Sequence, residues 1–482
     1  MLTTLAAPAF AGTWYIEDGN ITISAGTEAG TNKVEQAGKD TVDNDKDTII
    51  TNQNKDTASS NTVTIEAKDK DDKVEVTLKD VNIDTSSRNK AAVSVTGSGN
   101  TTIKLDGDNH LTGGNGIYSN SSGSLTISGD ENDSLTAQGG DSRNGIYSVS
   151  GDVTISGGTV TATGGNSTGS YGSGGDGIHS GSLTISGGST VTANGGNGSH
   201  GGSGISSSSG VTVSDGTVTA NGGNGGNVSG DGIRSDGGVT ISGGTVTANG
   251  GNSTNSSGGY GISSLDVAIS SGTVTANGGD SKDGYGGDGI HSNDIDLSGS
   301  LELTAKAGSP NGKALSQKGS ELDLNAIKDK LGPGAKVTAT DADGKVIDQV
   351  PIPRPVEPEG PVIPEESSSS SDGGSAAPST PAFPLPGLTV TDKSGAVIDS
   401  ISTQSGNTLT VCVGRLTASF RISLAALRQL RAEGIETITF QTILCSTTLS
   451  LDELLAMGGQ DTEVVLTHHI RSSTLTVGGR AV

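Results

Sequence analysis

The stretch GGDGIHSGSLTISGGSTVTANGGNG, residues 174–198, decides the fold, because close copies of it recur along the 482-residue chain. Its tetrapeptide Gly-Ile-x-Ser begins at Gly116, Gly145, Gly177, Gly204, Gly232, Gly261 and Gly289. The steps between these copies are 29, 32, 27, 28, 29 and 28 residues. Self-similarity at such a period predicts stacked structural repeats.

Each repeat contains three short runs in which apolar and polar residues alternate. In the copy at Gly177, one parity is apolar and the other polar; the apolar set is Ile178, Leu183, Ile185, Val191 and Ala193, and the polar set is His179, Thr184, Ser186 and Thr192. Alternation with period two indicates strands, and the glycine-rich pairs between the runs are turn formers that accept positive φ. Three strands therefore form one coil.

A single coil cannot bury its apolar side chains, but the next coil stacked at ~4.8 Å pairs every strand and closes a thin aliphatic core. The sequence thus predicts an all-β fold, a parallel β-helix with three-strand coils of about 28 residues. We expect it to be right-handed, as crossovers between parallel strands are. Composition alone, with 78 glycines, 30% apolar and 2% aromatic residues, would favour disorder. The regular period argues against that alternative.

Less regular alternation extends the β-helix to residues 62–346, with a short helical insertion near 325–331. Residues 12–61, which hold Trp14, are expected to form an N-terminal cap region. Ten of the thirteen prolines lie between Pro351 and Pro386, so 347–386 is predicted to be an extended Pro/Ser-rich linker. The remaining segment, 387–482, is predicted to be a small α+β domain with helices that begin after Ser423 and Ser450.

Residues 1–11 end in Ala9-Phe10-Ala11, a small-x-small pattern typical of a signal-peptidase site, although the basic and most of the apolar part of a signal are missing. We interpret them as a truncated signal peptide of a secreted or cell-surface bacterial protein; chance is the alternative. Both cysteines, Cys412 and Cys445, fall in predicted strands, and either a disulfide or two free thiols fits. No segment is long and apolar enough for a membrane helix.

Charge excludes one class of partner. Residues 116–308 contain 4 Lys or Arg and 16 Asp or Glu, a net charge of −12 out of −24 for the chain. Nucleic-acid binding needs a basic face and is not expected.

Outward side chains at equivalent positions of a β-helix form straight files. The third residue of Gly-Ile-x-Ser reads Tyr118, Tyr147, His179, Ser206, Arg234, Ser263 and His291, and Tyr171, Tyr260 and Tyr285 lie shortly before the same strands. Aromatic rings stack on sugar rings while polar neighbours bind hydroxyl groups, so we predict a glycan track along this edge. The alternative is that these tyrosines only cover loops or a strand face.

Asp176, Asp231 and Asp288 directly precede Gly-Ile and are candidate calcium ligands. They recur on every second coil, roughly 10 Å apart, so they cannot share one ion. A turn aspartate that accepts local backbone hydrogen bonds is the competing interpretation. Two asparagine files, Asn194, Asn221, Asn249, Asn277 and Asn166, Asn197, Asn224, Asn252, are predicted to be structural hydrogen-bonding ladders.

The copies GGDGIHS, SGDGIRS and YGGDGIHS, followed by runs such as ITISGGTVTA, resemble the clostridial-type bacterial carbohydrate-binding parallel β-helix proteins over about residues 60–346. The resemblance implies an exported, non-catalytic protein that binds plant-type or acidic polysaccharide together with calcium. Asp176, Asp231 and Asp288 match the family's Asp-Gly-Ile copies; Asn115, Asn144, Ser203 and Tyr260 depart from them.

We therefore expect a polysaccharide-binding β-helix without catalytic activity, with 387–482 as an attachment or partner module. One alternative is a structural stalk or adhesin spacer that has no glycan site. A polysaccharide lyase or glycosidase is the second alternative. Lyase chemistry needs a basic residue beside clustered carboxylates, but the most regular coils offer only Arg143, Arg234 and Lys282, and none of them adjoins a dense acidic cluster in the sequence.

Overall fold

The structure is a computed structural model, and it describes residues 12–351 and 388–481 with short gaps at 393–396, 399, 406, 414, 416, 433, 443–445, 459–461, 469–472 and 479. The predicted signal peptide at 1–11 and most of the predicted linker lie outside the described residues. Strands make up 54% and helices 6% of the described residues, and the first unit is a β-solenoid of about 12 turns. The parallel β-helix predicted from the repeats is confirmed.

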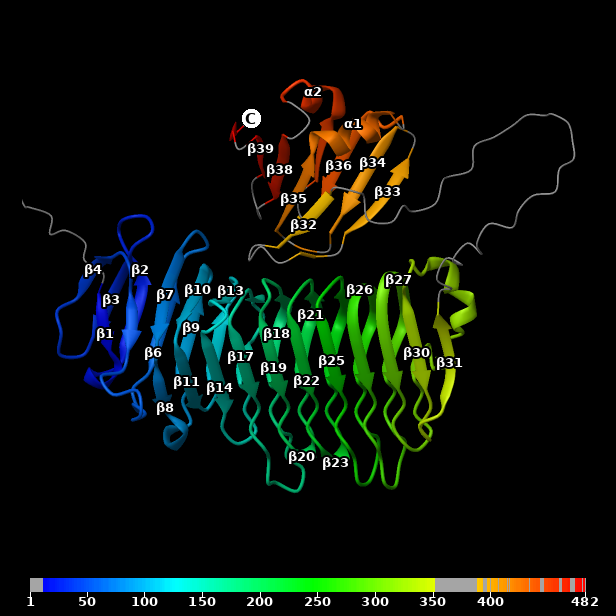
Figure 1. Cartoon of the computed structure of the whole chain (residues 1–482). Helices are drawn as coiled ribbons and strands as arrows, with labels where there is room; N and C mark the ends of the chain where they lie inside the picture. Colours follow the sequence, from blue (N-terminus) through cyan, green and yellow to red (C-terminus); the bar gives the residue numbers. More distant parts are fainter. Residues whose placement is uncertain are drawn as a thin grey trace, which may run out of the picture. The chain divides into compact units, whose positions relative to one another are not determined.

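Three parallel ladders run the length of the solenoid (Figure 1). The first ladder contains β2 (Ile21–Ala25), β6 (Val63–Ala67), β9 (Val93–Gly97), β12 (Ile117–Ser121), β15 (Ile146–Ser148), the starts of β18 (Ile178–Ile185), β21 (Ile205–Val213), β24 (Ile233–Ile241), β26 (Ile262–Asn277) and β27 (Ile290–Lys306), and β28 (Leu315–Gln317).

The second ladder contains β1 (Thr13–Tyr15), β5 (Ile49–Thr51), β7 (Lys73–Lys79), β10 (Asn100–Asp106), β13 (Leu125–Ser128), β16 (Val153–Ile155) and the later parts of β18, β21, β24, β26 and β27. The third contains β8 (Asn82–Asp84), β11 (Asp108–Gly113), β14 (Ser134–Gly139), β17 (Thr159–Thr163), β19 (Thr190–Asn194), β22 (Thr217–Asn221), β25 (Thr245–Asn249), the ends of β26 and β27, and β30 (Lys336–Thr340).

The apolar residues of each run point inward and fill the core, as predicted. Ile178, Leu183, Ile185, Val191 and Ala193 are at most 1% exposed, and their register partners on neighbouring coils are equally buried. Because each strand contributes two or three such residues, the core is a narrow column of Ile, Val, Leu and Ala rather than a thick aromatic interior.

Antiparallel strands lie at both ends of the column. β3 (Asn32–Gln36) pairs with β2, and β4 (Val42–Asp45) pairs with β3. At the other end β29 (Ser320–Glu321) pairs with β28, and β31 (Val346–Pro351) pairs with β30. The helical insertion predicted near 325–331 consists of two short turns, η3 (Leu324–Ala326) and η4 (Lys328–Lys330).

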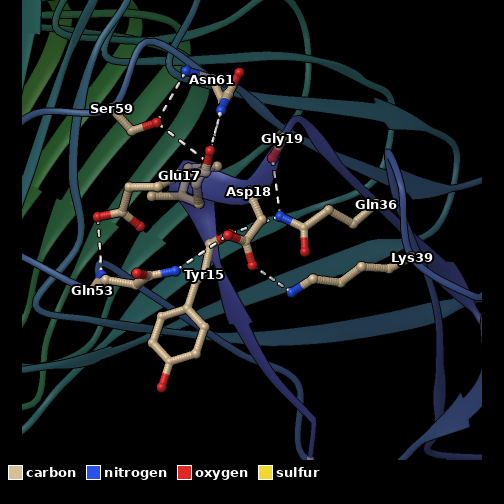
Figure 2. A network of polar contacts seen from close by, with 10 residues as sticks. Tyr15, Glu17, Asp18, Gly19, Gln36, Lys39, Gln53, Ser59 and Asn61 are labelled. Atoms are coloured by element: carbon tan, nitrogen blue, oxygen red, sulfur yellow. Dashed lines mark hydrogen bonds and ion pairs between the residues drawn. The ribbon is translucent and has the colours of Figure 1, made fainter.

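Residues 12–61, predicted as a cap region, supply strands to the first and second ladders as well as this antiparallel extension. Trp14 is 5% exposed, and its Nε1 donates to Asp45 Oδ2 at 3.0 Å. Figure 2 shows the polar contacts around the adjacent turn η1 (Ile16–Asp18): Gln36 Nε2 donates to the Tyr15 carbonyl at 2.7 Å, and Lys39 pairs with Asp18 at 2.7 Å. These contacts fix the start of the solenoid.

Loops that we call arms leave the third ladder and return to the first ladder of the next coil. The arms between Gly164 and Gly287 begin at a glycine pair and end at one or two glycines, and these glycines form a hydrogen-bonded lattice across the base of the arms. Gly196 N donates to Gly175 O at 2.8 Å, Gly202 N to Gly196 O at 2.9 Å, and Gly223 N to Gly202 O at 2.8 Å. The same zigzag continues as far as Gly308.

The glycine lattice corrects one expectation. The glycine pairs after the third run were predicted to be turns with positive φ, but a close backbone approach is what requires them: a Cβ on Gly223 would lie 2.0 Å from Gly196 O. Positive φ belongs instead to the turn between the second and third ladders, for example 70° at Gly188 and 77° at Gly244.

Both asparagine files are confirmed as structural ladders. Nδ2 of Asn221, Asn249 and Asn277 donates to Oδ1 of the asparagine one coil earlier, each at 2.8 Å. In the second file, Oδ1 of Asn166, Asn197 and Asn224 accepts the backbone N–H of the asparagine on the following coil at 2.7 to 2.8 Å.

The second unit is built on its own core and combines a five-stranded and a four-stranded sheet with two short helices. Its strands are β32 (Leu388–Thr391), β35 (Ala418–Ser423), β38 (Glu463–His468), β39 (Ser473–Val477) and β40 (Arg480–Ala481) in one sheet, and β33 (Ile401–Ser405), β34 (Thr408–Cys412), β36 (Thr437–Gln441) and β37 (Ser446–Ser450) in the other. The helices are α1 (Leu424–Ala432) and α2 (Leu451–Leu455).

The predicted helix starts are confirmed. Ser423 Oγ accepts the N–H of Ala426 at 3.2 Å, and Ser450 Oγ accepts that of Glu453 at 3.5 Å. Cys412 carries a free thiol, whereas Cys445 lies outside the described residues.

The glycine lattice generates a stability prediction. Gly223→Ala should lower the free energy of unfolding by about 2 to 3 kcal/mol, because the new methyl group would push two coils apart. Gly226→Ala is the matched control, since a Cβ there has Ser199 Cα at 3.7 Å as its nearest neighbour. Urea unfolding followed by circular dichroism measures both. Equal effects of the two substitutions would contradict a close-packed lattice.

Candidate functional site

The file predicted from Gly-Ile-x-Ser is present on the outer face of the first ladder. Tyr118 pairs in register with Tyr147, Tyr147 with His179, His179 with Ser206, Ser206 with Arg234, Arg234 with Ser263, and Ser263 with His291. Because the preceding isoleucine points into the core on every coil, the file residues must point out. We call this row the track.

Aromatic contacts divide the track into two parts. At one end the ring centroids of Tyr118 and Tyr147 are 5.7 Å apart, and those of Tyr147 and His179 are 5.0 Å apart. At the other end Tyr260 stacks on His291 with centroids 4.5 Å apart and an interplanar angle of 16°. The sequence did not separate these two clusters.

A cleft of about 740 Å³, open to solvent, contains the second of these aromatic clusters, because both Tyr260 and His291 line it. The track supplies Arg234, Ser263 and His291 to it. The returning arms form the facing wall, with Asp231 and Tyr260 at its base. Further lining comes from Val228, Ser229, Ser257, Gly258, Asp236, Leu265 and Asn293. A stacked ring pair, a guanidinium and several hydroxyl groups therefore face one space.

The sequence patterns singled out five residues of this cleft, Asp231, Arg234, Tyr260, Ser263 and His291, but did not indicate its wall. Asp236 and Leu265 lie within β24 and β26, between the parts of these strands that belong to the first and the second ladder, and Leu265 is 50% exposed. The sequence indicated only loops for the arm residues, although the length of these loops was a signal that an ordered wall could form there.

Two predicted tyrosines lie apart from the aromatic clusters. Tyr285 is 66% exposed and lines a smaller cleft of about 280 Å³ beside Tyr260 and His291. Tyr171 is 86% exposed at its arm, and in the part of the chain that is described no ring contact joins it to the track. Two of the five tyrosines expected along this edge therefore make no ring contact with the aromatic clusters among the described residues.

The three candidate calcium ligands have a structural role. Oδ1 of Asp176, Asp231 and Asp288 accepts the backbone N–H of the residue at the equivalent position on the next coil, at 2.7, 2.7 and 2.8 Å. The second oxygen of Asp176 contacts His179 Nδ1 at 3.1 Å, and that of Asp288 contacts His291 Nδ1 at 2.7 Å.

These contacts involve the same aspartate oxygens that a calcium ion would use. The aspartates lie on every second coil, and Asp176 and Asp288 use both of their oxygens within the protein. Among the described residues, no group of three or more His, Cys, Asp or Glu is placed to hold a metal ion. Calcium assistance therefore rests on the family resemblance alone.

Asp231 differs from the other two aspartates because no histidine follows it. It is 9% exposed, and burial raises the pKa of its carboxyl to about 6 despite the hydrogen bond from Tyr260 and the charge of Arg234. Burial, followed by the charges of Asp288 and Asp231, also raises the pKa of Tyr260, so its phenol stays protonated and can donate to a ligand.

Comparisons of the chain with protein-family models, curated proteins and solved structures find no match. The resemblance to clostridial-type carbohydrate-binding proteins stays a prediction. Within the described residues, no helix has the length and apolar character needed to cross a membrane.

Asp231 gives a pH-dependent prediction. Its folded pKa is raised, so its contribution to stability is present in acid and is lost as the pH rises through about 6. Asp231→Asn keeps the Oδ1 acceptor, as Asn144 does at the equivalent position. We expect this variant to be more stable than the wild type by about 2 to 3 kcal/mol at pH 8, since one pKa unit corresponds to about 1.4 kcal/mol.

Denaturant unfolding at pH 4 and pH 8 measures this difference, which should nearly vanish at the lower pH. Asp236→Asn is the control, because it removes a carboxylate from the same cleft that is 68% exposed. A gain that is independent of pH would show that the Asp231 charge is not what destabilises the solenoid.

Proposed function

We propose that this protein binds a polysaccharide along the track, outside the bacterial cell and without catalysing a reaction. The observation that carries the proposal is the open cleft in which the Tyr260–His291 ring pair, Arg234 and the Ser263 hydroxyl converge. Aromatic faces stack on the apolar faces of sugars, and charged or hydroxyl groups bind their hydroxyls. The solenoid repeats the same kind of surface from one coil to the next, which suits a polymeric ligand.

The cleft also favours binding over a purely structural role as a stalk. A spacer needs only the inward-pointing apolar residues of each strand and the glycine lattice. Tyr260, Arg234 and His291, by contrast, contribute side chains to the outer face. Ser206 and Ser263 are small where their neighbours on the track are large, which leaves room for a ligand between them. Residues 387–482 are proposed to serve as the attachment or partner module.

The proposal predicts a loss of affinity in one variant and not in another. For a glycan that the wild type binds, Tyr260→Ala should lower the affinity by about tenfold or more, because it removes the stacking surface. Tyr171→Ala removes an exposed ring outside the cleft and should bind as the wild type does. A glycan array followed by calorimetry measures both.

Absence of wild-type binding to every glycan would refute this function and favour the stalk. Equal losses in the two tyrosine variants would place the ligand elsewhere. The wild type should bind equally in calcium and in a chelator, since Asp176 and Asp288 use both of their oxygens, and Asp231 uses one, in contacts within the protein.

Hydrolysis is the second candidate function, and the raised pKa of Asp231 is the observation that favours it. A glycosidase needs a protonated carboxyl and a second carboxylate on the other side of the scissile bond. Asp236 is the other carboxylate of the cleft, but it is exposed and lies 3.8 Å from Arg234 Nε. We expect no release of reducing ends from a bound polysaccharide; release that is abolished in Asp231→Asn would establish catalysis instead.

A further inference from the structure

Two positions at the first ladder change with a period of two coils, although the fold repeats every coil. One position is the residue before Gly-Ile, and the other is the track residue three positions later. From residue 176 the pairs read Asp176 and His179, Ser203 and Ser206, Asp231 and Arg234, Tyr260 and Ser263, Asp288 and His291, Lys313 and Ser316. A carboxylate with a basic partner thus alternates with a serine.

The fold does not require this alternation. Asn115 and Asn144 occupy the first of these positions on successive coils, and each accepts the backbone N–H of the next coil at 3.0 and 2.7 Å. The same hydrogen bond could therefore be made on every coil. Core residues, asparagine ladders and the glycine lattice all repeat on every coil through this region.

The alternating pairs place a carboxylate and a nitrogen-bearing side chain, His179, Arg234 or His291, at a fixed interval. In two of them the aspartate engages Nδ1 of the histidine, which leaves Nε2 as the ring nitrogen for a ligand. In the third, Arg234 occupies the same track position and lines the cleft. Two coils correspond to roughly 9.6 Å at the usual strand separation.

We propose that the ligand is an uncharged, extended β-linked glycan that lies parallel to the solenoid axis, with two sugars for every two coils. This inference rests on the proposed function. In such a chain each sugar is turned over relative to the last, so equivalent hydroxyl groups face the protein only at every second sugar. The distance along the glycan from one sugar to the second sugar after it is close to the height of two coils. An α-linked helical glycan would not present its groups to a straight track in this way.

Charge favours an uncharged chain over an acidic one. Each basic group of the track has a carboxylate beside it: Asp176 at His179, Asp288 at His291, and Asp236 at Arg234. Residues 116–308 carry a net charge of −12. An anionic polysaccharide would meet this field along its whole length.

Binding of the full-length protein to matched oligosaccharides tests the proposal. The probes are soluble β-1,4-linked glucan, mannan and xylan oligomers, an α-1,4-linked glucan series and oligogalacturonate. For the β-linked series that binds, affinity should rise when sugars are added in pairs, by about fivefold per pair, and change little at odd lengths. Equal or tighter binding of the α-linked or acidic series, or an equal gain for every added sugar, would overturn this inference while leaving glycan binding intact. Failure of every probe and every array glycan would refute the proposed function itself.

Coil deletions test the register of the track. Deleting residues 203–230 removes one coil and places the Asp231 pair directly after the Asp176 pair, which destroys the alternation. Deleting residues 203–259 removes two coils and restores it, with Tyr260 and Ser263 between the two Asp-His pairs. We expect the shorter deletion to weaken binding of a long β-linked glycan more than the longer deletion does, by about tenfold. Thermal unfolding checks that both variants fold. Weaker binding by the two-coil deletion would mean that track length, and not its period, governs affinity.

Discussion

Parallel hydrogen bonding between each coil and the next is the interaction on which the rest of this molecule depends. It fixes the separation of the coils, and it places chemically equivalent side chains directly above one another. The glycine lattice extends this constraint beyond the strands, because the arms are held together by main-chain hydrogen bonds of 2.8 to 2.9 Å. A side chain at those positions would occupy the space of a neighbouring carbonyl oxygen.

The regular arrangement of side chains on the outer face follows from this stacking. Tyr260 and His291 are 31 residues apart in the chain but stack at 4.5 Å, because they stand on successive coils. The ordered arms then form a wall opposite the track, so a surface of short strands acquires a cleft. The candidate site is therefore a consequence of the repeat with a few substitutions at outward positions, and it needs no separate domain.

Much of this architecture follows from the sequence, because the period-two alternation and the 28-residue repeat both indicate short strands that stack coil upon coil. Local sequence patterns were enough to predict the buried apolar residues of each strand, the asparagine ladders, the file of residues that forms the track, and the two capped helices of the second unit. What could not be predicted depends on contacts between coils. The glycine pairs look like turn residues in a single repeat, and only the neighbouring backbone shows that they are needed for close packing.

The same limit applies to the site. Asp176 and Asp288 suggest metal ligands when each repeat is considered alone, but the following coil supplies the N–H that occupies one of their oxygens. The Asp-x-x-His spacing, which brings the second oxygen to Nδ1, was visible in the sequence and could have been used. The two aromatic clusters could not be separated in advance, since the direction of a loop tyrosine depends on how its arm is packed.

The most direct test of this account is a diffraction structure of the protein crystallised with the oligosaccharide that it binds most tightly. The account predicts a glycan that runs parallel to the solenoid axis, with a sugar ring on Tyr260 and equivalent hydroxyl groups at His291 and Arg234. A glycan bound across the coils, on the faces of the second or third ladder, or on residues 388–481 would contradict it.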